Sequence, residues 1–148
     1  MKVGNAIWAT ILIISLFGSF FIMTMEPSNP MDLPDYAFRN SQIREAYEFA
    51  RTNPLDLEGV ICSCGCMTEA GAAAHGSRVH PRGLRDCFMD GDLDEGGEWD
   101  SHASSCGLCY NDALDTKRLW GEGMSKDGIN DFLREKNAKL VFSKEVVY

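Results

Sequence analysis

All six cysteines and all three histidines of this 148-residue chain lie between Cys62 and Cys109. The surrounding segment, residues 59–104, is rich in glycine and polar side chains and has no helical or strand periodicity. A structureless loop of this length is uncommon inside a compact domain unless something other than a hydrophobic core orders it. The sequence therefore predicts that metal ions or disulfide bonds organise this segment.

The spacing of these residues favours metal binding. Side chains two apart in an extended segment point to the same face, so the Cys-x-Cys-x-Cys run can converge on one centre. The Cys-x-x-Cys pair opens a predicted helix, where the helix dipole stabilises the thiolate form that binds metal. The predicted metal ligands are Cys62, Cys64, Cys66, Cys87, Cys106, Cys109, His75, His80 and His102.

The types of ligand restrict the metal. Thiolates are soft ligands that favour Cu(I), zinc or iron–sulfur clusters, and imidazole favours zinc and copper. A mononuclear structural zinc site uses four ligands, so this larger set indicates a polynuclear cluster or two sites. We rank copper first and zinc second, because the domain is expected outside the cytoplasm. Iron–sulfur ranks third, since such clusters are rarely assembled there.

Two alternatives to metal binding stay open. Six cysteines outside the cytoplasm can form three disulfides, or one disulfide beside a metal site. Bridging within the Cys-x-Cys-x-Cys run is strained, because Cβ atoms must approach to about 3.8 Å. A thiol redox protein is the other alternative, but the segment before Cys106 is an acidic loop and not the strand of a βαβ unit. No catalytic residue is predicted.

Residues 1–25 differ in composition from the rest of the chain. Lys2 is the only charged side chain before Glu26, and the apolar run over residues 7–25 is long enough to cross a bilayer core of about 30 Å. No small-x-small cleavage motif follows, so we expect an uncleaved transmembrane anchor and not a signal peptide. The positive-inside rule places the N-terminus in the cytoplasm and the C-terminal domain outside. Residues 26–40 form an extended, proline-rich tether.

The formal net charge of −8 restricts the partners. An acidic domain repels nucleic acid and attracts cations, so no nucleic-acid partner is expected. Asp90, Asp92 and Asp94 match positions 1, 3 and 5 of a calcium loop. The required glycine comes one residue late, at Gly96, and Ser101 replaces the bidentate glutamate. A solvated acidic loop is therefore favoured over a weak calcium site.

The fold class is predicted to be mainly α. A small helical domain over residues 41–138 contains the long irregular Cys/His-rich segment, and one N-terminal transmembrane helix precedes it. Helices are expected over residues 41–51 and 105–120, and a third begins at Ser125. Residues 139–148 are predicted to be a strand or a docking tail. The apolar stripes of the three helices contain Ile43, Ala46, Tyr47 and Ala50; Cys109, Ala113, Thr116 and Trp120; and Ile129, Phe132 and Leu133.

The chain resembles the PCYCGC-motif proteins, small bacterial lipoproteins and related membrane-anchored proteins of largely unknown function. The resemblance runs from about Glu45 to Arg134. Ile61 and Ser63 stand where the motif has proline and tyrosine, and no cysteine precedes Cys62 to carry a lipid. The resemblance implies a membrane-tethered metal-binding protein and supplies no activity. The matching segments are ICSCGC at 61–66, Cys87-Phe88, WDSHASSCGLC at 99–109 and GEGMS at 121–125.

Two classes of function follow. The first is extracytoplasmic capture, storage or delivery of copper or zinc by the Cys/His cluster. The second is an accessory subunit of a larger membrane protein complex, in which metal or disulfides only stabilise the fold. The apolar tail at residues 140–148 suits that second class, because it could contact other subunits. Exposed thiolates would favour delivery, whereas a closed and buried site would favour a structural role.

Overall fold

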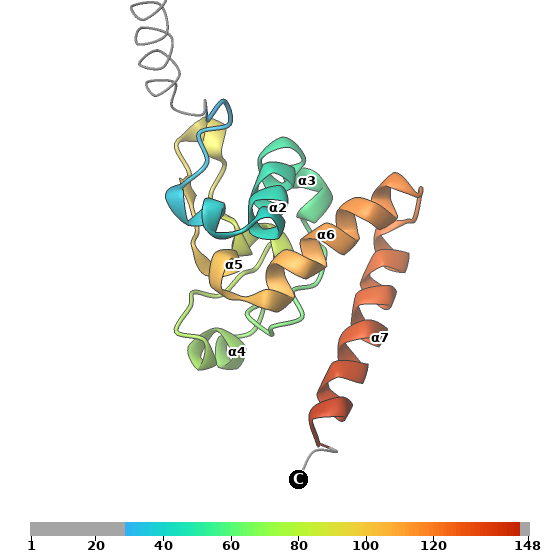
Figure 1. Ribbon diagram of the computed structural model, residues 1–148. Helices are drawn as coiled ribbons and strands as arrows, with labels where there is room; N and C mark the ends of the chain where they lie inside the picture. Colours follow the sequence, from blue (N-terminus) through green and yellow to red (C-terminus); the bar gives the residue numbers. More distant parts are fainter. Residues whose placement is uncertain (1–28, 146–148) are drawn as a thin grey trace, which may run out of the picture. The chain divides into compact units, whose positions relative to one another are not determined.

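The computed structural model describes residues 29–145, with side chains as far as Ala138 (Figure 1). The predicted transmembrane helix lies outside the described residues, as does the start of the tether. No helix within residues 29–145 is both long and apolar enough to cross a membrane. The folded unit begins at Met31.

The described chain is mainly helical, which confirms the predicted class. Long helices α2, α6 and α7 are joined by short helices, 3-10 turns and one two-stranded sheet. The elements are η1 (Asp35–Arg39), α2 (Ser41–Thr52), α3 (Pro54–Leu57), α4 (Glu69–Ala74), η2 (Gly83–Cys87), β1 (Met89–Asp90), η3 (Leu93–Glu95), β2 (Glu98–Trp99), α5 (His102–Ser105), α6 (Gly107–Gly121) and α7 (Lys126–Glu145).

Helix α2 confirms the first predicted helix. The side chain of Asn40 accepts a hydrogen bond from the Ile43 N–H at 2.8 Å, which caps the N-terminus of the helix. The buried face of α2 packs against α6 (Figure 1). Tyr47 lies at its centre, with its ring 4.9 Å from that of Phe88, and its hydroxyl donates to the Asp100 carbonyl at 2.6 Å. This contact ties α2 to the chain just before the C-terminal cysteines.

Helix α6 begins two residues later than predicted, because His102–Ser105 forms the separate short helix α5. Thr116 is buried as expected, but Trp120 is 39% exposed and Leu119 is buried in its place. The buried face is rotated toward Leu119 and Asp112. Asp112 contacts α7 through a hydrogen bond from Asn137 at 3.1 Å. A second helix therefore covers a flank of α6 that periodicity alone did not indicate.

Helix α7 begins where predicted and extends further. The Ser125 hydroxyl accepts from the Gly128 N–H at 3.3 Å, and Ile129 and Leu133 are buried. The strand considered for residues 139–148 is wrong as far as Glu145, because the helix continues to that residue, and the alternative of a docking tail stays a prediction. No glycine or proline interrupts residues 129–145, so nothing in the sequence ends the helix earlier.

Residues 59–104 contain more regular structure than predicted. Helix α4 is capped by the Thr68 hydroxyl, which accepts from the Gly71 N–H at 3.1 Å. Strands β1 and β2 pair antiparallel, with Met89 opposite Trp99. The alanine-rich run in α4 has high helix propensity, so a signal for this helix was present in the sequence. These elements are short, and the longer connections between them carry several of the predicted metal ligands.

Candidate metal centre

Four cysteine sulfurs meet in the interior of the folded unit. Cys62 Sγ lies 3.0 Å from both Cys64 Sγ and Cys87 Sγ, and 3.5 Å from Cys109 Sγ. Cys109 Sγ lies 3.6 Å from Cys64 Sγ. The four sulfurs all lie within 4.8 Å of one another. We call these four residues the inner group.

A second group of four ligand atoms overlaps the first. It consists of Cys64, His102, Cys106 and Cys109, whose ligand atoms also lie within 4.8 Å of one another. His102 Nε2 lies 3.6 Å from Cys64 Sγ. We call these residues the outer group; it shares Cys64 and Cys109 with the inner group. Five cysteines and one histidine are thus close enough together to hold metal.

The ligands come from segments that are far apart in the chain. Cys62 and Cys64 lie in the loop after α3, Cys87 ends η2, and His102 begins α5. Cys109 lies in the first turn of α6. The approach of η2 to the loop depends on a hydrogen bond from the Leu84 N–H to the Val60 carbonyl at 2.8 Å. Packing of these short elements therefore assembles the cluster.

Cys66 is not in either group, although the Cys-x-Cys-x-Cys spacing predicted that it would converge with Cys62 and Cys64. The chain turns at Gly65, which has a φ of +87°, and the Gly65 N–H donates to the Cys62 carbonyl at 3.1 Å. A turn breaks the alternation that an extended segment would have. Cys66 Sγ consequently faces His102 Nε2, at 3.5 Å.

The other two predicted histidines lie at the edge of the cluster. His80 is buried, with Nδ1 3.2 Å from Cys87 Sγ and Nε2 3.2 Å from the Ser77 hydroxyl. His75 is exposed, and its Nε2 donates to the Cys64 carbonyl at 3.0 Å. His80 is therefore the histidine beside the Cys87-Phe88 pair, whereas His75 contacts the backbone of the loop.

Hydrogen bonding within the cluster shifts the thiol pKa values. The interaction with Cys109 lowers the pKa of Cys62 to about 7. Hydrogen bonds from Cys106 and Cys109 lower the pKa of Cys64, whereas the hydrogen bond with Cys106, followed by that with Cys62, raises the pKa of Cys109. Burial raises the pKa of Cys66 to about 12. The lowered values favour thiolate, the form that binds metal, at two positions of the inner group.

The cysteine sulfurs form one group and not separate disulfide pairs. A disulfide joins each sulfur to a single partner at about 2.05 Å. Cys62 instead has two sulfur neighbours at the same distance, and all six cysteines are free. Four thiolates around one zinc ion at about 2.3 Å would lie about 3.8 Å apart, close to the longer of the observed distances. The arrangement therefore fits a shared ion better than three separate disulfides.

A cleft opens beside the outer group. It has a volume of about 670 Å³ and lies between the start of α6, helix α7 and His75. His102 and Cys106 line it, whereas Cys62 and Cys87 do not. The cleft therefore borders His102 and Cys106, the two residues that belong only to the outer group.

A buried polar network that was not predicted from the sequence holds the cysteine loop. Asp112 is fully buried, and one of its carboxylate oxygens accepts from the Ser63 N–H at 3.2 Å. The other accepts from the Asn137 amide at 3.1 Å and lies 3.5 Å from Lys136 Nζ. Burial raises the pKa of Asp112, and the hydrogen bond from Ser63 opposes this shift. The only sequence signal was an acid on the buried face of a helix.

We expect Asp112→Ala to lower the free energy of unfolding by roughly 1–3 kcal/mol, because it leaves the Ser63 N–H without its acceptor, whereas Lys136 keeps its ion pair with Asp115. Asp112→Asn should cost less, since the amide oxygen can still accept from the Ser63 N–H. Denaturant unfolding of both variants measures the difference. Equal losses for the two variants would show that this acceptor does not matter.

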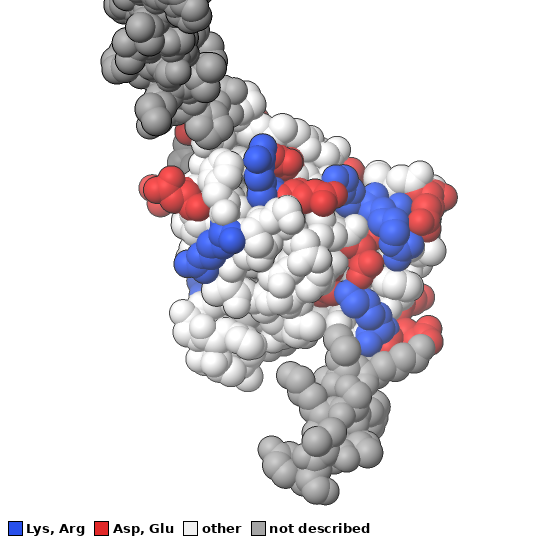
Figure 2. All heavy atoms as spheres, viewed as in Figure 1, with Lys and Arg blue, Asp and Glu red and all other residues white. Residues whose placement is uncertain are grey.

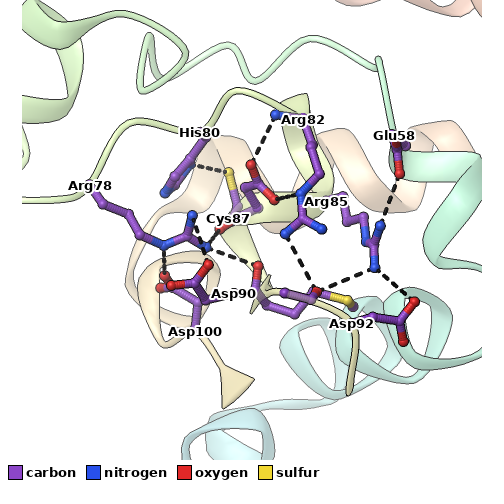
Figure 3. Close-up of polar contacts among 12 residues, drawn as sticks. Glu58, Arg78, His80, Arg82, Arg85, Cys87, Asp90, Asp92 and Asp100 are labelled. Carbon is purple, nitrogen blue, oxygen red and sulfur yellow. Dashed lines mark hydrogen bonds and ion pairs between the residues drawn. The ribbon is translucent and has the colours of Figure 1, made fainter. Parts of the chain in front are cut away.

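Three arginines lie within η2 or shortly before it (Figure 3). The Arg82 guanidinium donates to the buried carboxylate of Asp86 at 2.7 Å. Arg78 donates to the Asp86 carbonyl at 2.9 Å, and Arg85 donates to Glu58 at 2.9 Å. Together these contacts fix the turn that carries Cys87, which Figure 3 shows beside the His80 ring.

The acidic loop does not form the calcium site that was considered for it. No three carboxylate side chains in the described part of the chain lie close enough together to hold an ion. The three carboxylates each face a different arginine. Acidic and basic side chains also lie side by side on much of the face drawn in Figure 2. The pairs are Asp90 with Arg78 at 3.6 Å, Asp92 with Arg85 at 3.5 Å and Asp94 with Arg51 at 2.7 Å.

Comparison with known proteins gives a family but no activity. Searches of curated proteins and of solved structures found no match. A family model described as a protein of unknown function with PCYCGC motif matches residues 27–142. This match covers α2, α6, most of α7 and every residue of the cluster. The chain belongs to the PCYCGC-motif family.

Proposed function

We propose that this protein binds a soft metal ion, Cu(I) before zinc, through its Cys/His cluster. The observation that carries the proposal is the convergence of five thiols and one imidazole in two overlapping groups. Soft thiolates select Cu(I) and zinc over the hard cations that carboxylates prefer. Copper ranks first because this cysteine-rich cluster is expected on the extracytoplasmic side of a membrane.

The metal is proposed to be bound on the extracytoplasmic side of a membrane. The support comes from the sequence: the apolar run over residues 7–25, and Lys2 as the only charge before Glu26. In this position the protein would capture, store or deliver metal. The cleft beside His102 and Cys106 supports capture and delivery, because an incoming ligand could reach the outer group there.

A structural role is the second candidate function. Cys62, Cys87 and Cys109 are part of the hydrophobic core, packed with side chains such as Phe88 and Ala113. Metal held by these thiols would stabilise the fold without being exchanged. In that case the protein would be an accessory subunit of a larger membrane protein complex.

The test is elemental analysis and a thiol count on the full chain purified from its native membrane. We expect bound copper or zinc and reduced cysteines. A mass six hydrogens below that of the reduced chain, without metal, would show three disulfides and refute the proposal. Zinc without copper would support the proposed metal binding and would show that zinc, and not Cu(I), is the metal bound. Partial oxidation that changes reversibly with added thiol would favour a redox protein instead.

A further inference from the structure

We infer that the cluster holds two metal ions bridged by Cys64 and Cys109, and that only the outer ion exchanges, through the cleft beside it. This inference rests on the proposed metal-binding function and assigns a number, a bridging pair and an exchange route to the same site.

The bridging assignment follows from the two shared ligands. Each group supplies four ligand atoms, the number that a tetrahedral zinc ion requires. The groups have Cys64 and Cys109 in common, and a thiolate sulfur has lone pairs enough to bind two ions. Two ions can therefore each obtain four ligands from six side chains, whereas one four-coordinate ion would leave two of the clustered side chains without metal.

Charge supports a second ion. Five thiolates in the cluster carry five negative charges when all bind metal. One ion of charge one or two leaves most of that charge uncompensated, in a place where burial makes unpaired charge costly. A second ion lowers the residual charge. Lys136, which lines the cleft, already pairs with Asp112 and Asp115.

The two positions differ in access. The ligands found only in the inner group, Cys62 and Cys87, are 5% and 0% exposed and lie in the hydrophobic core. Cys87 is also enclosed by the buried His80 ring. Removal of the inner ion therefore requires the core to open, which is rare compared with motion at a surface.

The outer position faces solvent. His102 and Cys106 are half-buried and line the cleft, together with the exposed His75. Asn137 lines the same cleft, and its buried amide oxygen has no hydrogen-bond partner among the described residues. An incoming ligand can bond to the outer ion as His102 or Cys106 releases it. This exchange substitutes one ligand for another, and no electron is transferred.

The experiment combines native mass spectrometry with removal of metal by a chromogenic Cu(I) or zinc chelator. The full chain is used, purified with the metal that it holds. We expect two ions per chain and two phases of release, with the second about a hundredfold slower because it requires opening of the core. Circular dichroism should show that the helices persist after the first phase.

Matched cysteine variants assign the phases. Cys106→Ser removes a ligand of the outer group only, so it should leave one ion and abolish the fast phase. Cys87→Ser changes the inner group only and should abolish the slow phase. Cys66→Ser is the control, because Cys66 lies in the same motif but in neither group, and it should keep both ions and both phases.

The failures of the two proposals are distinguishable. A chain without metal refutes the proposed function itself. One ion per chain, or two ions released at equal rates, refutes this inference and leaves metal binding intact. Loss of an ion in Cys66→Ser would also overturn it, because that thiol would then be a ligand. If Cys87→Ser fails to fold, the inference is still tested by the two phases of release in the wild type and by the number of ions and the phases in Cys106→Ser.

Discussion

Replacement of both shared cysteines, Cys64 and Cys109, by serine is expected to abolish metal binding and to release residues 59–104 from their fold. Both groups lose two of their four ligands in this variant. Structural zinc contributes roughly 10–16 kcal/mol of apparent binding energy in small domains, which is similar in size to the net stability of about 5–15 kcal/mol of a typical protein. We therefore expect residues 59–104 to lose their ordered structure when the metal-binding energy is lost.

Limited proteolysis with mass mapping measures this effect. Cleavage should fall within residues 59–104, while circular dichroism should retain part of the helical signal from α2 and α7. Cys66→Ser is the matched control and should stay resistant to the protease. If the double variant keeps the protease resistance and melting behaviour of the wild type, the cluster does not order this segment.

Gly83→Ala is expected to lower the free energy of unfolding by roughly 3 kcal/mol. Gly83 is buried with a φ of +82°, and a Cβ there would lie 2.3 Å from the Val60 carbonyl oxygen. The left-handed conformation costs a side chain about 1 kcal/mol, and overpacking against the backbone adds about 1–3 kcal/mol. The same carbonyl accepts from the Leu84 N–H, so the clash separates the cysteine loop from η2.

Gly76→Ala is the matched control. Gly76 also has a positive φ, +61°, but a Cβ there would meet nothing within 4 Å. We expect a loss of about 1 kcal/mol, from the backbone conformation alone. Urea unfolding of both variants measures the difference, and equal losses would show that contact with the Val60 carbonyl contributes nothing.

Helices with a strong local signal could be predicted from the sequence. Asn40 caps α2, the Asn53-Pro54 pair ends it, and apolar residues recur on one face between them. The short elements between residues 59 and 104 were mostly missed. A 3-10 turn such as η2 has too few residues for periodicity, and one of its arginines, Arg85, bonds to Glu58, which lies 27 residues away in the chain.

Membership of the Cys/His cluster could be predicted only in part. Six of the nine predicted ligands come together, and Cys66, His75 and His80 lie at the edge. The spacing of Cys62, Cys64 and Cys66 is compatible with an extended run or with a turn. The turn at Gly65 decides between them, and its partner, Gly71 in α4, packs against it so closely that a Cβ there would lie 2.1 Å from the Gly65 carbonyl oxygen.

The sequence by itself determined the family, the helical class and the chemistry of the candidate site, because these depend on residue types and on short-range spacing. The tertiary structure alone decided which sulfurs are shared, which are buried and which face a cleft. Cys64 and Cys109 are 45 residues apart and meet only because the loop, η2 and α6 pack together. Asp112 and Asn137 pair across two helices for the same reason, and no pattern within either helix specifies that contact.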